Sequence, residues 1–113
     1  MDGLELWQSI SERLDLLDEA VKSIRFRGRD YAEAEAEYRK ALAVEELRLR
    51  VDDGFPVTLI PDLARGKDDI ADLKAKRDCA EANYKSALEA INVNKLRIKV
   101  LEAQAEREWG RCR

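Results

Sequence analysis

The sequence predicts an all-α protein, a long antiparallel helical hairpin of the coiled-coil type. Charged residues make up 40% of its 113 residues, and helix formers dominate. With only 5 glycines and 2 prolines, long stretches carry no helix breaker. Apolar residues recur in alternating steps of three and four through both halves, as in helices that share a narrow seam. One domain covering residues 1–113 is expected from this length.

The first helix is expected from about residue 4 to residue 51. Its seam is a single series of positions in constant phase: Trp7, Ile10, Leu14, Leu17, Val21, Ile24, Gly28, Tyr31, Glu35, Tyr38, Leu42, Glu45 and Leu49. A break would normally reset the phase, and a helical glycine costs only about 1 kcal/mol relative to alanine. We therefore predict one continuous helix, with a bend near residue 28 as the alternative.

The second helix is expected from about residue 62 to residue 109. Pro61 suits a first helical turn, where its missing N–H would be unpaired anyway, and Gly110 can end the helix. The predicted seam again keeps one phase: Leu63, Gly66, Ile70, Leu73, Arg77, Ala80, Tyr84, Ala87, Ile91, Asn94, Ile98, Leu101 and Ala105.

Residues 52–61 form the predicted connecting loop, which is extended and unusually apolar. Gly54 and Pro56 end the first helix, and Phe55, Val57 and Leu59 alternate with the period of a strand. Together with Ile60 these three side chains form a predicted interaction loop. It can pack on the tip of its own hairpin, contact a second subunit, or recognise a foreign partner.

A short connector makes the two helices antiparallel neighbours, and their seams can be aligned. The alignment pairs Leu49 with Leu73, Leu42 with Ala80, Tyr38 with Tyr84, Tyr31 with Ile91, and Ile24 with Ile98. It also places Glu45 opposite Arg77 and Gly28 opposite Asn94. An ion pair inside an apolar seam usually reduces stability but can define the register.

A second set of apolar residues lies off these seams. Two helices cannot bury both sets between themselves, and exposed apolar patches usually mark an interface. Self-association into a homo-oligomeric bundle of four or more helices is therefore expected. The second set comprises Val44, Leu47, Val51, Leu88, Val93, Leu96 and Val100.

A basic cluster is the main candidate for ligand binding. The predicted register brings two basic runs to one level of the hairpin, and guanidinium groups bind phosphate oxygens in a bidentate manner. The candidate phosphate or nucleotide site consists of Arg25, Phe26, Arg27, Arg29, Lys95, Arg97 and Lys99, with Phe26 stacking on a base. The alternative is a solvated surface whose charges pair with Glu19, Asp30, Glu33 and Glu102.

Several function classes are disfavoured by composition. The chain has no histidine, and its two cysteines, Cys79 and Cys112, are too isolated for a zinc or redox site. No nucleophile is paired with a base, so neither an enzyme nor a cofactor is expected. A net charge of −3 disfavours DNA as a partner. No apolar run could span a bilayer or act as a signal peptide, which predicts a cytoplasmic protein.

Three stretches of the chain resemble a family of small, uncharacterised helical proteins encoded by tailed phages and prophages of Gram-positive bacteria. They are residues 38–43, the loop 54–66 and residues 84–92. The resemblance implies a non-enzymatic accessory protein in the host cytoplasm. Such a protein could antagonise host defence, either by sequestering a phosphate-containing nucleotide signal or by blocking a host protein. The alternative is a structural or adaptor coiled coil in phage assembly or DNA replication.

Overall fold

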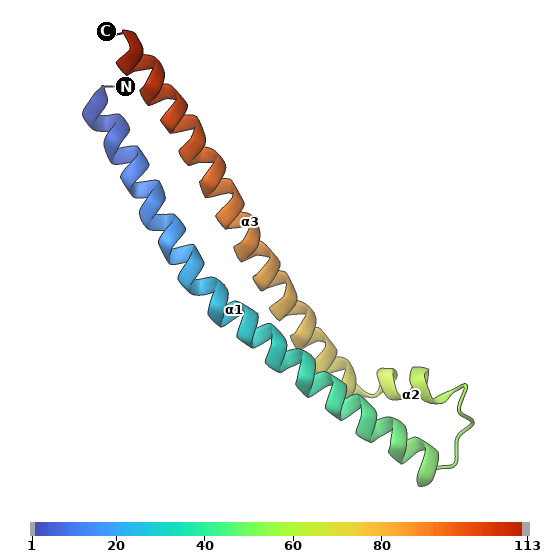
Figure 1. The fold of residues 1–113 in the computed structure, drawn as a ribbon. Helices are drawn as coiled ribbons and strands as arrows, with labels where there is room; N and C mark the ends of the chain where they lie inside the picture. Colours follow the sequence, from blue (N-terminus) through green and yellow to red (C-terminus); the bar gives the residue numbers. More distant parts are fainter. Residues whose placement is uncertain (1, 112–113) are drawn as a thin grey trace. The chain divides into compact units, whose positions relative to one another are not determined.

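Three helices make up the fold of this protein in a computed structural model that describes residues 2–111 (Figure 1). Helix α1 spans Gly3–Val51, α2 spans Ile60–Gly66 and α3 spans Asp68–Arg111. The prediction of an all-α protein is confirmed. No strand occurs between residues 2 and 111, so the alternating apolar side chains of the connector belong to turns and irregular backbone.

Helix α1 runs unbroken through Gly28, as the constant phase of its seam predicted. Its first turn is capped reciprocally. The backbone N–H of Glu5 donates to Asp2 Oδ1 at 2.8 Å, and the backbone N of Asp2 donates to the Glu5 carboxylate at 3.4 Å. Such a capping box satisfies backbone donors that have no partner inside the helix. The start of α1 is thus encoded by two acidic residues three positions apart.

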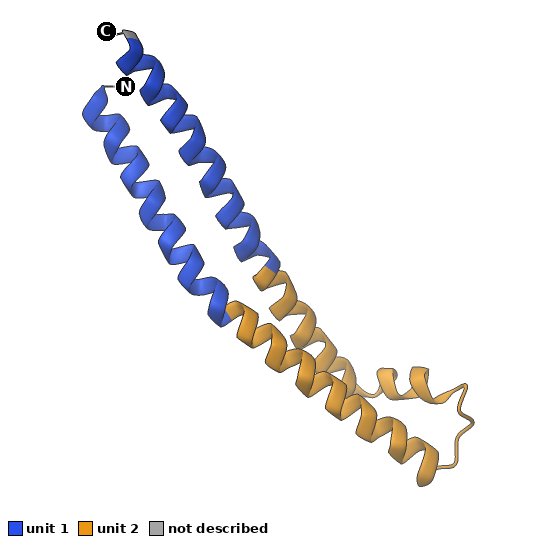
Figure 2. Cartoon of the chain, in the orientation of Figure 1, with its two compact units in different colours: residues 1–26, 85–113 blue, residues 27–84 orange. Residues whose placement is uncertain are grey.

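The chain divides into two compact units (Figure 2). The terminal unit contains residues 1–26 and 85–113, and the connector unit contains residues 27–84. In each unit a segment of α1 lies antiparallel to a segment of α3. The connector unit also contains α2 and the loop before it, where Gly54 has a φ of 67°, in the left-handed region that glycine adopts without strain.

The sequence predicted one helix from about residue 62 to residue 109, and this prediction is wrong because the segment forms two helices, α2 and α3. Helix α2 ends at Gly66, and Lys67 is extended, with φ −67° and ψ 137°. The break lets α2 turn its two buried residues, Ile60 and Ala64, onto Leu49 of α1. Burial of this apolar surface is the physical reason for the break, and it leaves the predicted seam positions Leu63 and Gly66 exposed.

The seam of α3 agrees with the sequence pattern, and that of α1 agrees in part. Every predicted seam position from Ile70 to Ala105 is buried or half-buried. In the terminal unit, however, Trp7, Leu14 and Val21 are exposed, whereas Leu6 is only 2% exposed. Half-buried seam positions in this part of α1 include Ile10, Arg13, Leu17, Ala20 and Ile24. Two neighbouring stripes of a helix can have this spacing. The stripe that faces α3 contains residues 6, 13 and 20, each one position before the predicted residues 7, 14 and 21.

The predicted register between α1 and α3 is wrong. In the connector unit the Tyr84 ring lies 6.1 Å from that of Tyr31, and the Arg77 guanidinium lies 5.0 Å over the Tyr38 ring. Arg77 Nη1 pairs with Glu35 Oε2 at 3.0 Å, not with Glu45. The two ring contacts are shifted by one heptad from the predicted pairs, and the ion pair is shifted by ten positions. Such a slide returns the same stripes to the same interface, so the apolar pattern cannot exclude it.

Gly28 permits a close approach that should be measurable as energetic coupling. A Cβ atom at this position would lie 3.3 Å from Tyr84 Cε2, which is closer than an ordinary van der Waals contact. In a helix, Gly28→Ala gains about 1 kcal/mol from propensity alone. We expect this gain in a Tyr84→Ala background and a smaller gain, or none, in the natural sequence. Urea unfolding of the four proteins tests this, and equal gains in both backgrounds would contradict the contact.

Candidate functional site: an arginine-lined groove

The seven residues of the predicted phosphate site fall into both units. Arg25, Phe26, Lys95, Arg97 and Lys99 belong to the terminal unit, whereas Arg27 and Arg29 belong to the connector unit. All seven are exposed. None of the six cations forms an ion pair with any carboxylate of residues 2–111, and their exposure agrees with the alternative of a solvated surface.

The register that would bring the two basic runs to one level is not the one adopted. In the terminal unit Arg13 Nη1 donates to Asn94 Oδ1 at 3.3 Å, which places the second basic run beside Arg13 and not beside Arg25. Gly28, predicted to face Asn94, lies instead against Tyr84. The binding role of the seven residues therefore stays a prediction, and Arg97 is the member that lines a groove in this unit.

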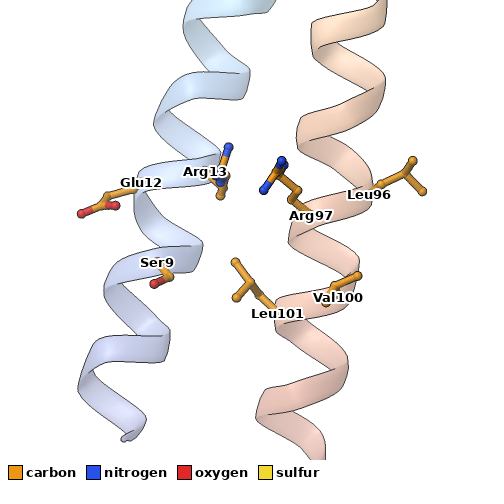
Figure 3. Close-up of a pocket in the computed structure, with 7 residues that line it drawn as sticks. All are labelled: Ser9, Glu12, Arg13, Leu96, Arg97, Val100 and Leu101. Carbon is orange, nitrogen blue, oxygen red and sulfur yellow. The ribbon is translucent and has the colours of Figure 1, made fainter. Parts of the chain in front are cut away.

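This groove, here called the arginine groove, runs between α1 and α3 of the terminal unit (Figure 3). Two hollows, of about 470 Å³ and 490 Å³, share Arg13 and Arg97 and so adjoin each other. The first is also lined by Ser9, Glu12, Leu96, Val100 and Leu101, and the second by Leu16, Ser86, Glu89, Ala90, Val93 and Asn94.

Arg13 and Arg97 project toward each other between the two helices, while Glu12 projects away from them (Figure 3). Neither arginine forms an ion pair within the described part of the chain, although Glu12 and Glu89 also line the groove. The hydrogen bond to Asn94 orients the half-buried Arg13. Two guanidinium groups that face each other without a counterion can bind one anion between them.

Apolar side chains also line the two hollows beside the arginines. Leu96 and Val100 are 62% and 64% exposed, and Leu16 and Val93 line the adjoining hollow. A bound molecule could cover this apolar surface while its anionic group contacts the arginines, because burying apolar area is favourable and independent of direction. The arrangement therefore suits a ligand that combines an anion with an uncharged, flat or apolar part.

Sequence reasoning missed Arg13 because it assigned position 14 to the seam. The signal available in the sequence was a positively charged residue, Arg13, three positions after Ile10 and four before Leu17. Had the stripe been taken through Leu6, Ile10, Arg13 and Leu17, the arginine would have been an isolated charge inside an apolar interface. Such a residue requires a polar partner, and Asn94 on the facing helix supplies one.

Among the described residues, the most buried charge belongs to a different cluster, in the connector unit. Glu45 is 5% exposed and accepts from Arg48 Nη2 at 2.6 Å and from Lys67 Nζ at 3.0 Å. These two hydrogen bonds lower the pKa of Glu45 to about 2, and the bond from Arg48 has the larger effect. The same interaction with Glu45 raises the pKa of Lys67. Because Lys67 is the residue between α2 and α3, the cluster ties that junction to α1.

The interaction loop is divided by the structure. Ile60 is 6% exposed and packs with Leu49 and Ala64, so this residue contacts its own hairpin. Phe55, Val57 and Leu59 are 40%, 65% and 51% exposed. These three side chains remain available to a partner.

Two further properties bear on the class of site. No three His, Cys, Asp or Glu side chains of the described residues are placed to hold a metal ion. Within the same residues, no helix has a stretch long and apolar enough to cross a bilayer. Comparison of the chain with protein-family models, with curated proteins and with solved structures gave no match.

Proposed function

We propose that this chain is a non-enzymatic binding protein whose arginine groove holds an anionic ligand, with a phosphate-bearing nucleotide as the leading class. The observation that supports this most is the pair Arg13 and Arg97, which face each other without a carboxylate partner in the described part of the chain. Guanidinium groups match phosphate oxygens in both charge and geometry.

The walls of the groove explain why a nucleotide fits better than a free phosphate ion. A base or ribose presents flat, uncharged surface that Leu96, Val100 and Val93 can cover while the phosphate contacts the arginines. The hydroxyl of Ser9 and the amide of Asn94 add hydrogen-bonding groups at the edges. Phe26, proposed from sequence to stack on a base, is exposed in the same unit but does not line the groove.

The biological role that we propose follows the resemblance to phage proteins. A small binding protein without catalytic groups could sequester a nucleotide signal of the host, or block a host defence protein, inside the infected cell. The first of these uses the arginine groove directly.

Isothermal titration calorimetry with a cyclic dinucleotide, a nucleoside triphosphate and inorganic phosphate tests the proposal. A hydrogen bond to a charged group contributes roughly 1.5–3 kcal/mol, so Arg13→Ala and Arg97→Ala should each weaken nucleotide binding by about tenfold or more. Inorganic phosphate should bind more weakly than either nucleotide, because it leaves the apolar walls uncovered.

Arg107→Ala is the matched control, because Arg107 is exposed on α3 in the terminal unit but neither lines the groove nor belongs to the predicted site. The affinity of this control variant for the nucleotides should stay close to that of the natural sequence. Circular dichroism should show the same helicity for all variants. Equal losses in all three variants would indicate diffuse charge attraction. Unchanged binding in both arginine variants would reject the groove, and no binding of any probe at millimolar concentration would reject the ligand class.

A second candidate function is that of an adaptor, and the exposed part of the interaction loop favours it. Phe55, Val57 and Leu59 have exposed apolar side chains on irregular or turn backbone, where a partner protein could cover them. We expect such a partner to be recovered from phage-infected cells by the natural sequence but not by a Phe55→Ala, Leu59→Ala double variant. Recovery that is lost with Arg97→Ala instead would assign the partner to the groove.

A further inference from the structure

The two hollows of the arginine groove follow one another along the helices of the terminal unit. Arg13 and Arg97 line both hollows, so this pair lies where the hollows meet. On α1, Ser9 of the first hollow comes before Arg13, and Leu16 of the second hollow comes after it. On α3 the order is reversed, as in antiparallel helices, and Val100 of the first hollow follows Arg97. The arginine pair is therefore in the middle of the groove.

Both hollows open on the same side of the two helices. Ser9 and Leu16 line different hollows but are seven residues apart, so they lie on one side of α1. Val93 and Val100 also line different hollows, and the same spacing places them on one side of α3. A single elongated ligand can therefore enter both hollows while its middle contacts the arginines.

Each hollow is large enough to hold one nucleoside. The volumes of about 470 Å³ and 490 Å³ lie within the range of roughly 300–1,000 Å³ that is usual for small-molecule sites. On α3 the lining residues extend from Ser86 to Leu101, about 22 Å at roughly 1.5 Å per residue. One nucleotide covers only part of this length, whereas two nucleosides joined through phosphate can extend along it.

The charges of the groove are positive in the middle, with one carboxylate among the residues of each hollow. Glu12 lines the first hollow and Glu89 the second, and neither pairs with a cation of residues 2–111. Each hollow also has a hydroxyl, from Ser9 or Ser86. A carboxylate repels a phosphate but accepts hydrogen bonds from amino groups of a base and from ribose hydroxyls. The hollows therefore favour the uncharged parts of a nucleotide.

We propose that the ligand of the arginine groove is a dinucleotide, with its phosphates between Arg13 and Arg97 and one nucleoside in each hollow. This inference rests on the proposed function, because it specifies which class of nucleotide the groove holds. A dinucleotide has its negative charge in the middle and flat, uncharged groups at both ends, as the groove requires. A nucleoside triphosphate has its base at one end and its phosphates at the other, so the phosphates would enter a hollow that contains a carboxylate.

Isothermal titration calorimetry with ligands that share one base tests this class: AMP, ATP, cyclic di-AMP and a longer oligoadenylate. Cyclic di-AMP should bind about tenfold or more tightly than AMP and ATP, because linking two nucleosides makes the second binding event intramolecular. The oligoadenylate should bind less tightly than cyclic di-AMP, since its further phosphates continue past the arginines into the hollows.

The possible outcomes separate this inference from the proposed function. Binding of AMP or ATP as tight as that of cyclic di-AMP would overturn the dinucleotide class and leave nucleotide binding in place. Tightest binding of the oligoadenylate would assign the groove to single-stranded nucleic acid and also overturn the inference. If none of the four ligands binds, both proposals are rejected.

Neutralising the two carboxylates tests the charge arrangement. The double variant Glu12→Gln, Glu89→Gln should bind ATP roughly threefold or more tightly than the control does, because the repulsion of the phosphates is removed. The control is Glu102→Gln, Glu106→Gln, which changes the net charge equally at exposed positions of α3 that do not line the groove. The affinity for cyclic di-AMP should not rise above that of the control. An equal rise for both ligands would overturn the proposal.

Discussion

Leu49→Ala is expected to destabilise the protein by about 2–4 kcal/mol, the usual range for removing a buried leucine side chain. Leu49 is 6% exposed and joins the two buried residues of α2, Ile60 and Ala64, to α1. Its truncation leaves a cavity at the point where the connector folds back onto the hairpin. Urea unfolding followed by circular dichroism at the helix band measures the loss in unfolding free energy.

Leu47→Ala is the matched control for this substitution, because it changes the same residue type on the same helix. Leu47 is 63% exposed, so its truncation should cost less than about 1 kcal/mol when the protein is dilute enough to be monomeric. Equal losses at both positions in dilute solution would contradict the burial of Leu49.

Acidification is expected to remove the contribution of Glu45 to stability between pH 4.5 and about pH 2. The hydrogen bonds from Arg48 and Lys67 lower the pKa of this carboxyl from 4.5 to about 2. A lowered pKa means that the unfolded chain binds the proton first, so folding stability is complete above pH 4.5 and falls as the pH approaches 2. The α2–α3 junction should loosen first, because Lys67 then loses its buried anionic partner.

Glu45→Gln should flatten the dependence of unfolding free energy on pH in this window and lower the stability at pH 7. Urea unfolding at pH 7, 5, 4, 3 and 2 measures the difference. Glu35 and Asp78 also have pKa values lowered by neighbouring cations, but they are present in both proteins and cancel in the comparison. Glu46→Gln should leave the profile nearly unchanged. A profile for Glu45→Gln that matches the natural sequence would refute the assigned role.

The candidate site was only partly readable from the sequence. Arg97 was chosen because basic residues cluster around it, and the structure places it in the groove, while its binding role stays a prediction. Arg13 was not identified, because a stripe through Trp7 and Leu14 is more apolar than the one through Leu6 and Arg13 that faces α3. Local hydrophobicity favoured the wrong stripe, and only the contact with Asn94 identifies the right one.

The connector shows the same division between local and distant information. Gly54 and Pro56 predicted the end of α1 correctly, because backbone preferences act over a few residues. The break at Lys67 was not predicted, although Gly66 precedes it. It depends on two long-range contacts, the packing of Ile60 and Ala64 on Leu49 and the ion pair between Lys67 and Glu45.

The sequence by itself determined that this protein is all-α, where α1 begins and ends, and which face of α3 is buried. These features follow from the spacing of apolar residues and the positions of breakers, which are local properties of the chain. Only the tertiary structure decided the register, the separation of α2 from α3, and the meeting of Arg13 with Arg97. In the connector unit a slide by one heptad preserves the apolar stripes, so the register there rests on contacts between distant residues, such as Arg77 with Tyr38 and Glu35. In the terminal unit the contact of Arg13 with Asn94 identifies the stripe of α1 that faces α3.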